Sequence, residues 1–223
     1  NDFINNMTHE LKTPLATISL AVDALKNEKV LSNPEKMSYF TNMIKDENKR
    51  MNKHVETILQ AAHLEKKENE LNRQLVNIND LIQGVIESFK LQLEGKPSNV
   101  QTILEASPSI IKADEEHILH VLSNLIDNAI KYSKNDIDIT IQTKTLHNKT
   151  CIRIIDKGIG MDANARKHIF EKFYRAHSGN VHDVKGYGLG MSYVKWVIDT
   201  HKGQITVNSE IGVGTTIEII LPN

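Results

Sequence analysis

The run from Asn5 to Leu15 gathers three chemically active side chains on one predicted helix. Glu10 directly follows His9, and Thr13 comes four residues after the histidine, about one helical turn further along. Wound at about 100° per residue, the apolar residues around this run share one face, and His9 points almost directly away from it. An imidazole in solvent beside a carboxylate has its nitrogens available for chemistry. A lone histidine there is more often an ordinary solvated side chain, so only the rest of the chain can indicate whether His9 is chemically active.

A second polar group lies on a strongly apolar predicted helix that runs from about Asp114 to Ser133. Asn124, Asn128 and Lys131 follow one another at four- and three-residue steps, which places them on one face. A neutral amide oxygen can complete the octahedral oxygen shell of Mg²⁺, and a lysine can meet phosphate. Taken alone, this pattern fits a metal and phosphate site and the polar face of a half-buried helix equally well.

Asp156 stands at the end of an apolar predicted strand, and Gly158 and Gly160 follow it closely. A carboxylate at a strand end can accept a hydrogen bond from the exocyclic amine of adenine, and glycines let the backbone approach a ligand. By themselves these residues indicate no more than an Asp/Gly turn.

Two further glycine-rich runs follow. Gly186, Gly188 and Gly190 lead into a predicted helix, where exposed backbone N–H groups and the helix dipole favour phosphate. This run is neither the dinucleotide fingerprint nor the Walker loop, because the required strand and the Lys-Ser/Thr pair are missing. The last run, Gly212 to Thr215, precedes the final strand and alone would be interpreted as a hairpin turn.

The elements that position these residues begin with two long helices. Residues 1–30 are predicted to form one amphipathic helix, Asn33-Pro34 interrupts it, and a second helix follows to about residue 68. Each helix carries an apolar series at seven-residue steps: Ile4, Leu11, Ile18 and Leu25, then Met37, Ile44, Met51 and Ile58. A hairpin of two such helices cannot cover both faces alone, so we expect a homodimer through residues 1–68 and a four-helix bundle.

The composition shifts at the charged stretch 65–70, which predicts a first domain over residues 1–70 and a second over residues 71–223. Strands are expected near residues 74–78, 100–105, 137–145, 150–156, 204–209 and 215–221. Helices are expected from a cap near Asn79, over 114–133 and over 189–201, with a long loop over 157–187 that carries one or two short helices. Helices with a mixed or antiparallel sheet predict an α/β sandwich, and the whole chain is α+β.

The composition also excludes several kinds of partner. With 27 basic and 28 acidic residues, the net charge of -1 provides no field for nucleic acid or anionic lipid. The single Cys151 excludes an intramolecular disulfide and is expected to be a buried core residue. No run approaches the roughly 20 apolar residues of a membrane span, so we expect no direct membrane contact. The same two observations lead us to expect a soluble protein from a reducing compartment. The chain opens at Asn1 without Met, so we also expect it to be a piece of something longer.

In this order and with these spacings, the four runs of the second half resemble the N, G1, G2 and G3 boxes of two-component sensor histidine kinases. Residues 170–175 resemble the F box of that family, and His9 to Pro14 its H box. The resemblance spans residues 1–222. It implies a dimerisation and phosphoacceptor hairpin followed by a Bergerat-type (GHKL) domain that binds ATP. Two positions depart from the pattern, with Tyr187 where Ser or Thr is common and Met191 where Leu is common.

Carried over position by position, the resemblance implies a site for ATP and Mg²⁺. Asn128 would bind the metal with support from Asn124, and Asp156 would recognise adenine. Arg175 is a candidate for the γ-phosphate, where its fork would offset developing charge. The other implied nucleotide-binding residues are Lys131, Tyr132, Gly158, Gly160, Gly186, Gly188, Leu189, Gly190 and Thr215. Phe170 and Phe173 would anchor the lid by packing or, as the alternative, together sense the nucleotide.

The resemblance also assigns the chemistry of the first helix. His9 would attack the γ-phosphorus through Nε2 while Glu10 holds the Nδ1 proton. The phosphoryl group would then pass to an aspartate on a response regulator receiver domain, and Glu10 and Thr13 would orient water to dephosphorylate that partner. We favour a continuous helix through Pro14, kinked beside His9, over a helix that starts there with Thr13 as its cap.

Two other functions share part of this pattern. A catalytically silent scaffold would bind ATP, or nothing, and regulate by dimerisation, although no expected ATP ligand is missing. A Bergerat-fold ATPase of the chaperone or topoisomerase kind would not need the His9 hairpin. The kinase interpretation also implies a cytoplasmic piece of a protein anchored in the cytoplasmic membrane, with a stimulus that the sequence does not name.

Overall fold

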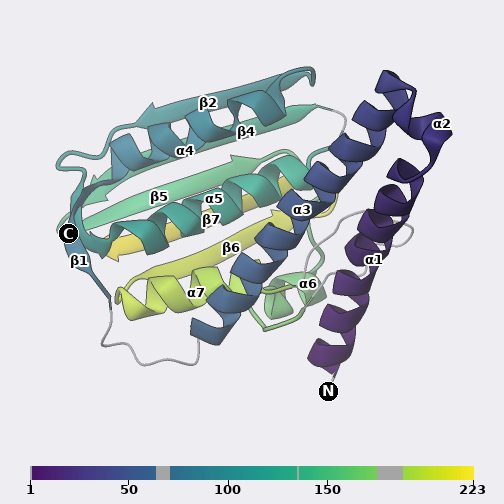
Figure 1. Ribbon diagram of the computed structural model, residues 1–223. Coiled ribbons are helices and arrows are strands. Elements are labelled where there is room, and N and C mark those ends of the chain that lie inside the picture. The colour runs from purple at the N-terminus through teal and green to yellow at the C-terminus, as the bar shows by residue number, and fades with distance from the viewer. Residues whose placement is uncertain (1, 64–70, 135, 175–187) are drawn as a thin grey trace. The chain divides into compact units, whose positions relative to one another are not determined.

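The computed structural model describes residues 2–63, 71–134, 136–174 and 188–223, with side chains of the first helix described from Lys12 onward. The chain divides into two compact units, Asn1–Glu65 and Lys66–Asn223 (Figure 1). Across the described ranges, no helix combines the length and the apolar character needed to cross a membrane.

The first unit is a hairpin of two long helices, α1 (Asp2–Leu25) and α3 (Pro34–His63), connected through the short helix α2 (Glu28–Leu31). The prediction of a single helix over residues 1–30 is therefore wrong beyond Leu25. Asn27 has an extended backbone, and its side chain accepts a hydrogen bond from the N–H of Lys29 at 3.0 Å, which starts α2 as a separate helix. The side chain of Asn33 accepts a similar bond at 3.1 Å at the start of α3.

Pro14 lies inside α1, so the helix is continuous through the proline. The alternative in which Thr13 caps a new helix is wrong. Because proline has no backbone N–H, the carbonyl of Glu10 lacks its usual helical donor. Pro14 and Ala21, seven residues apart, are buried within the hairpin. Much apolar surface stays exposed in the single chain, on Leu15, Leu20, Val22, Leu31, Met37 and Tyr39.

The second unit is built on a mixed five-stranded sheet with the strand order β2-β4-β5-β7-β6. The strands are β2 (Ser98–Leu104), β4 (Ile137–Leu146), β5 (Lys149–Asp156), β6 (Gln204–Glu210) and β7 (Gly214–Pro222). Strands β2 and β4 pair in parallel, and the other three pairings are antiparallel. Asp156 ends the central strand and lies opposite Ile139 on one side and Thr215 on the other.

Three helices cover one face of this sheet: α4 (Ile78–Leu93), α5 (Glu115–Lys131) and α7 (Gly190–Thr200) (Figure 1). Aliphatic side chains fill the layer between helices and sheet, including Ile82, Leu122, Leu125, Ile139, Ile152, Ile198 and Ile219. The antiparallel ribbon of β1 (Arg73–Asn77) and β3 (Ile110–Asp114) and the short helix α6 (Ala163–His168) complete the unit. The predicted α+β class, a helical hairpin followed by an α/β sandwich, is confirmed.

The beginning of the second unit differs from the sequence prediction in two ways. The cap of α4 is Asn77, whose side chain accepts hydrogen bonds from the backbone N–H groups of Asn79 and Asp80. The predicted cap, Asn79, instead accepts a hydrogen bond from Thr143 on the neighbouring sheet at 2.8 Å. Strand β3 has no predicted counterpart, because its few residues run straight into Asp114, the cap of α5.

Candidate functional site

Two asparagines on α5 lie against the start of α7. Helix α5 buries its apolar face in the core and leaves Asn124 and Asn128, one turn apart, half-buried. Nδ2 of Asn128 donates to Sδ of Met191 at 3.4 Å, and Nδ2 of Asn124 donates to the carbonyl oxygen one turn earlier at 3.0 Å. Oδ1 of Asn124 lies only 3.0 Å from the place that a Cβ on Gly190 would take. A side chain at position 190 would therefore press on the Asn124 amide where the two helices approach.

The amide oxygens are the polar atoms left at this junction. Both amino groups are engaged, and neither Oδ1 of Asn124 or Asn128 accepts a hydrogen bond from any residue in the described ranges. Helix α7 begins here with no side-chain cap from the described residues, so within these ranges its first N–H groups are also left for another acceptor.

The donor set fits Mg²⁺ only in company with phosphate. Over the described residues, no group of three or more His, Cys, Asp or Glu side chains gathers to hold a metal ion. Mg²⁺ commonly takes one or two protein oxygens and fills its octahedron with substrate phosphates and water. Amide oxygens beside an uncapped helix N-terminus, which favours phosphate, fit such a shared site.

The two carboxylate oxygens of Asp156 differ in their hydrogen bonds to the described residues. Its Oδ1 accepts the backbone N–H groups of Gly158 at 2.8 Å and of Thr215 at 3.2 Å. Oδ2 accepts no hydrogen bond from the described part of the chain. Burial raises the pKa of the Asp156 carboxyl, although the two N–H donors act in the opposite direction. A partly buried acceptor without a protein donor suits an amine of a ligand, such as that of adenine.

Close backbone packing fixes the glycines around Asp156. A Cβ on Gly158 would collide with the carbonyl oxygen of Tyr132 at the end of α5. Gly160 and Gly214 have φ values of 69° and 136°, and a Cβ on either would collide with a backbone carbonyl oxygen. Packing alone therefore explains why these three positions are glycine, and the same packing keeps this wall of the site thin.

The residues after α6 are tied to the start of α7 through the backbone. The N–H of Phe173 donates to the carbonyl oxygen of Gly188 at 2.9 Å, and both residues have positive φ, 67° and 68°. A Cβ on Gly188 would lie 2.7 Å from the carbonyl oxygen of Tyr174, which requires glycine here. The Phe173 side chain is 42% exposed, and its backbone N–H ties this segment to the start of α7.

Four other predicted residues also lie in this region. Lys131 is exposed in the last turn of α5, with Nζ 3.9 Å from an aspartate oxygen one turn earlier. Tyr132 caps the end of α5, and its carbonyl oxygen accepts the backbone N–H of Ile159, between Gly158 and Gly160, at 3.0 Å. Leu189 is buried directly before α7, and Thr215 contributes its N–H to Asp156.

The remaining predicted residues fall wholly or partly outside the description. Arg175 and Gly186 lie in 175–187, outside the described residues, and the side chains of His9 and Glu10 are likewise not described. Thr13 is exposed on α1. Because α1 is continuous, the four-residue step places Thr13 on the same helical face as His9.

Three residues at this site escape the sequence prediction as site residues. Met191 engages Asn128, and Nζ of Lys134 donates to the carbonyl oxygen of Gly212 at 2.6 Å. The buried Ser209 donates to the carbonyl oxygen of Gly214 at 2.9 Å. Ser209 stands where the alternation of β6 predicts an inward apolar residue, and this mismatch could have marked it as a site residue. Nothing in the sequence around Lys134 marks it in the same way.

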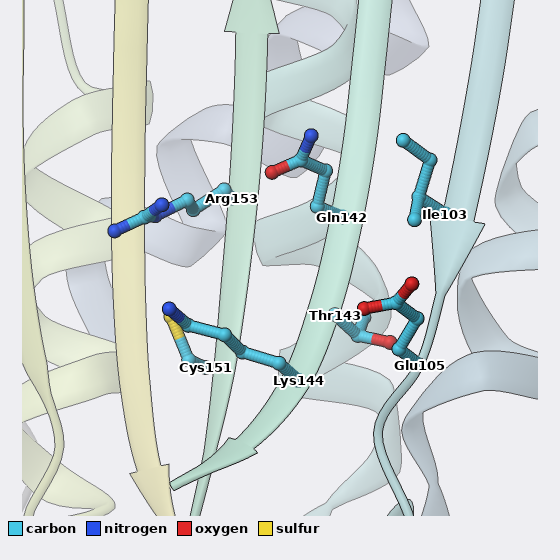
Figure 2. A pocket seen from close by; sticks show the side chains of 7 residues that line it. All are labelled: Ile103, Glu105, Gln142, Thr143, Lys144, Cys151 and Arg153. Carbon is cyan, nitrogen blue, oxygen red and sulfur yellow. The ribbon is translucent and has the colours of Figure 1, made fainter.

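The opposite face of the sheet has its own small hollow of about 120 Å³ (Figure 2). The hollow contains none of the predicted nucleotide residues and is lined by Ile103, Glu105, Gln142, Thr143, Lys144, Cys151 and Arg153. Cys151 is buried as expected, but it points away from the helices, on the same side of β5 as Arg153. Burial raises the pKa of the Cys151 thiol, which makes it a poor nucleophile.

Two protein families match the chain, one at each end. Residues 1–67 match the His Kinase A (phospho-acceptor) domain, and residues 113–223 match the histidine kinase-, DNA gyrase B- and HSP90-like ATPase family. The chain is 45% identical over its full length to the sensor protein RprX of Bacteroides fragilis. It spans 43% of the length of RprX, so that relative is more than twice as long.

Two solved structures share the fold. The full-length ShkA structure with AMPPNP gives a TM-score of 0.73 at 23% identity, covering 99% of this chain and 45% of ShkA. The histidine kinase ThkA, solved in complex with the response regulator TrrA, gives a TM-score of 0.72 at 22% identity, covering 100% of this chain and 61% of ThkA.

Proposed function

Because this chain belongs to the family of two-component sensor histidine kinases, we propose that it carries their catalytic activity. His9 takes the γ-phosphoryl group of ATP, and an aspartate of a response regulator then receives it. The observation that carries this proposal is the open cluster: the oxygens of Asn124, Asn128 and Asp156 that no described residue engages, and the start of α7, which no described side chain caps. We also propose that this portion is cytoplasmic and that the full-length protein is anchored in the cytoplasmic membrane.

The open cluster suggests how the nucleotide is held. Asp156 Oδ2 accepts the exocyclic amine of adenine, and the N–H groups at the start of α7 bind phosphate. Mg²⁺, when bound, would neutralise charge on the phosphates, and Asn128 Oδ1 is its proposed protein ligand, with Asn124 beside it. Lys131 and Arg175 supply positive charge; the remaining proposed contacts are Tyr132, Gly158, Gly160, Gly186, Gly188, Leu189, Gly190 and Thr215.

The phosphoryl transfer uses two neighbouring residues of α1. Nε2 of His9 forms a bond to the γ-phosphorus, the bond from that phosphorus to the bridging oxygen breaks, and ADP leaves with the electron pair. Glu10 holds the Nδ1 proton, which makes Nε2 the nucleophilic nitrogen. Pro14 frees the carbonyl of Glu10 from the helical ladder and so eases local bending of α1 during the transfer.

The direct test of kinase activity is incubation of the chain with γ-labelled ATP and Mg²⁺. We expect a label that is lost in acid and kept in alkali, as for a phosphoramidate. His9→Ala should abolish the label and leave nucleotide binding intact, whereas His147→Ala, in the exposed β4–β5 turn, should not change it. Label that survives His9→Ala would move the acceptor elsewhere, and tight ATP binding without any label would favour a silent scaffold.

We further propose that two copies associate through residues 1–68. The exposed Leu15, Leu20 and Val22 on α1 leave apolar surface that a second hairpin can bury. A charge placed in the seam, by Ile18→Glu, should release monomers because an unpaired charge would be buried there. Sedimentation at micromolar concentration is the measurement, and a wild-type chain that sediments as a monomer would contradict the proposal.

Phosphatase activity toward the same regulator is the last part of the proposal. Thr13 lies on the His9 face of α1, where its hydroxyl can hold a water near an incoming aspartyl phosphate. Thr13→Ala should therefore keep autophosphorylation and slow the decay of the phosphorylated regulator. Equal loss of both activities would indicate damage to α1 around Pro14 instead.

A further inference from the structure

Met191 makes an unusual contact with the proposed metal ligand. It is half-buried in the first turn of α7, and its sulfur lies 3.4 Å from Nδ2 of Asn128 on α5. Among the described residues, this is the one hydrogen bond made by the Asn128 amide. The sulfur is therefore the group that can decide which way this amide points.

The chemistry of a thioether makes that choice one-sided. A thioether sulfur has lone pairs and no proton, so it accepts a hydrogen bond weakly and cannot donate one. The amino group of Asn128 must then face Met191, and Oδ1 is directed to the other side of the amide plane. The two ends of an amide have nearly the same shape, so without such a partner sterics alone would not distinguish them.

Orientation matters because only one end of an amide can bind a cation. The oxygen is a ligand for Mg²⁺, whereas the amino group presents protons and repels it. Leucine, the common residue at position 191 in the resembling pattern, has about the same volume but offers no acceptor. We propose that Met191 is a positioning residue that fixes the Asn128 amide with its oxygen toward the metal; this rests on the proposed function of Asn128.

The test compares ADP binding with excess Mg²⁺ and with EDTA, by calorimetry, in the wild-type chain and in Met191→Leu. Leucine conserves volume and helix propensity, so the fold should be kept, which far-UV circular dichroism would check. We expect the gain in ADP affinity on adding Mg²⁺ to shrink about two- to tenfold, the equivalent of one ordinary hydrogen bond. Affinity in EDTA should stay within about twofold of wild type, since the contact orients the amide and does not touch the nucleotide. Met37→Leu, on α3 in the other unit, is the matched control and should change neither value.

A double-mutant cycle with Asn128→Ala separates the positioning role of Met191 from the metal-binding role of Asn128. In the Asn128→Ala background, Met191→Leu should have no further effect on the Mg²⁺ gain, because no amide remains to orient. Equal losses with and without Mg²⁺, or no change at all in Met191→Leu, would overturn the positioning role. If Mg²⁺ raises the ADP affinity of Asn128→Ala as much as that of wild type, the metal ligand itself is misassigned.

Discussion

Two buried or half-buried aspartates in the second unit, Asp114 and Asp156, are satisfied in very different ways. Asp114 caps α5: its Oδ1 accepts the N–H of His117 at 3.2 Å, and its Oδ2 accepts the N–H of Asn72 at 2.9 Å. Asp156 places both of its protein hydrogen bonds on Oδ1 and leaves Oδ2 unused by the described residues. Both carboxylate oxygens of Asp114 therefore accept hydrogen bonds from the protein, whereas only one of Asp156 accepts any from the described residues.

The surroundings of the two aspartates repeat this difference. Asp114, His117, Tyr193 and His201 form a closed cluster at the far end of α5 from Tyr132. His201 accepts the backbone N–H of Asp114 through Nε2 at 3.0 Å and, through Nδ1, contacts the carbonyl oxygen of its own helix at 2.8 Å. The hydroxyl of Tyr193 lies 2.7 Å from Nδ1 of His117. Each of these polar side chains has a protein partner.

The difference indicates which polar residues serve the fold and which await a ligand. Burying a polar group without a partner costs free energy, so a folded chain normally pairs all of them. The closed cluster follows that rule, and the open cluster departs from it at three side-chain oxygens and one helix start. Such a departure is expected where a ligand completes the hydrogen bonds.

Asp156→Ala should have a larger effect on nucleotide binding than Asp114→Ala or His201→Gln. Removing the acceptor should weaken ADP about 10- to 100-fold and leave GDP unchanged, which removes the preference for adenine. Because burial raises the pKa of Asp156, wild-type affinity should also fall when the pH is lowered into the mildly acidic range, and the variant should lack this fall. Competition titrations with ADP and GDP over pH measure both effects, and an unchanged base preference would show that Asp156 does not contact the base.

Asp114→Ala should show the opposite behaviour, with loss of stability and little loss of binding. The variant removes the cap of α5 and leaves two backbone N–H groups without an acceptor, which should cost about 2 kcal/mol of unfolding free energy. Denaturant unfolding would give this value, and ADP titration of the folded variant should remain within about twofold of wild type. A stable variant that fails to bind ADP would erase the distinction between the two clusters.

His201→Gln should produce the smallest effect, visible as a change in pH dependence. Burial lowers the pKa of His201, so as the pH falls the unfolded chain takes up the proton first. The stabilisation that neutral His201 provides is complete above about pH 6.5, the ordinary pKa of histidine. This stabilisation is lost as the pH falls toward the lower pKa of His201 in the folded chain. The stability of wild type should therefore fall more between pH 7 and pH 5 than that of His201→Gln, as measured by urea unfolding. Parallel curves would show that His201 keeps its proton affinity on folding.

The sequence predicts the elements of this fold well where apolar periodicity is long. The stripe on α5 and the alternation along β4 and β5 each locate their element within a few residues. Prediction fails where local hydrogen bonds decide, as at Asn27, which stops the first helix early, and at Asn77, which caps α4. Such caps depend on backbone angles that a pattern of residue types does not contain.

The site shows the same limit on a smaller scale. The spacing of Asn124 and Asn128 and the glycines after Asp156 mark the open cluster, because helical steps and strand ends have fixed geometry. The contact between Met191 and Asn128 joins residues 63 positions apart, on two different helices. No local pattern records it, and so the sequence shows Met191 only as a departure from leucine.

The most direct test of the distinction between the two clusters uses two substitutions on the same helix. MgADP is titrated calorimetrically into the wild-type chain, Asn128→Ala and His117→Gln. Asn128 belongs to the open cluster and His117 to the closed cluster, and both are half-buried on α5. We expect the affinity for MgADP to fall at least about tenfold in Asn128→Ala and to stay within about twofold of wild type in His117→Gln. Wild-type affinity in Asn128→Ala, or an equal loss in both variants, would contradict the assignment of the open cluster to nucleotide binding.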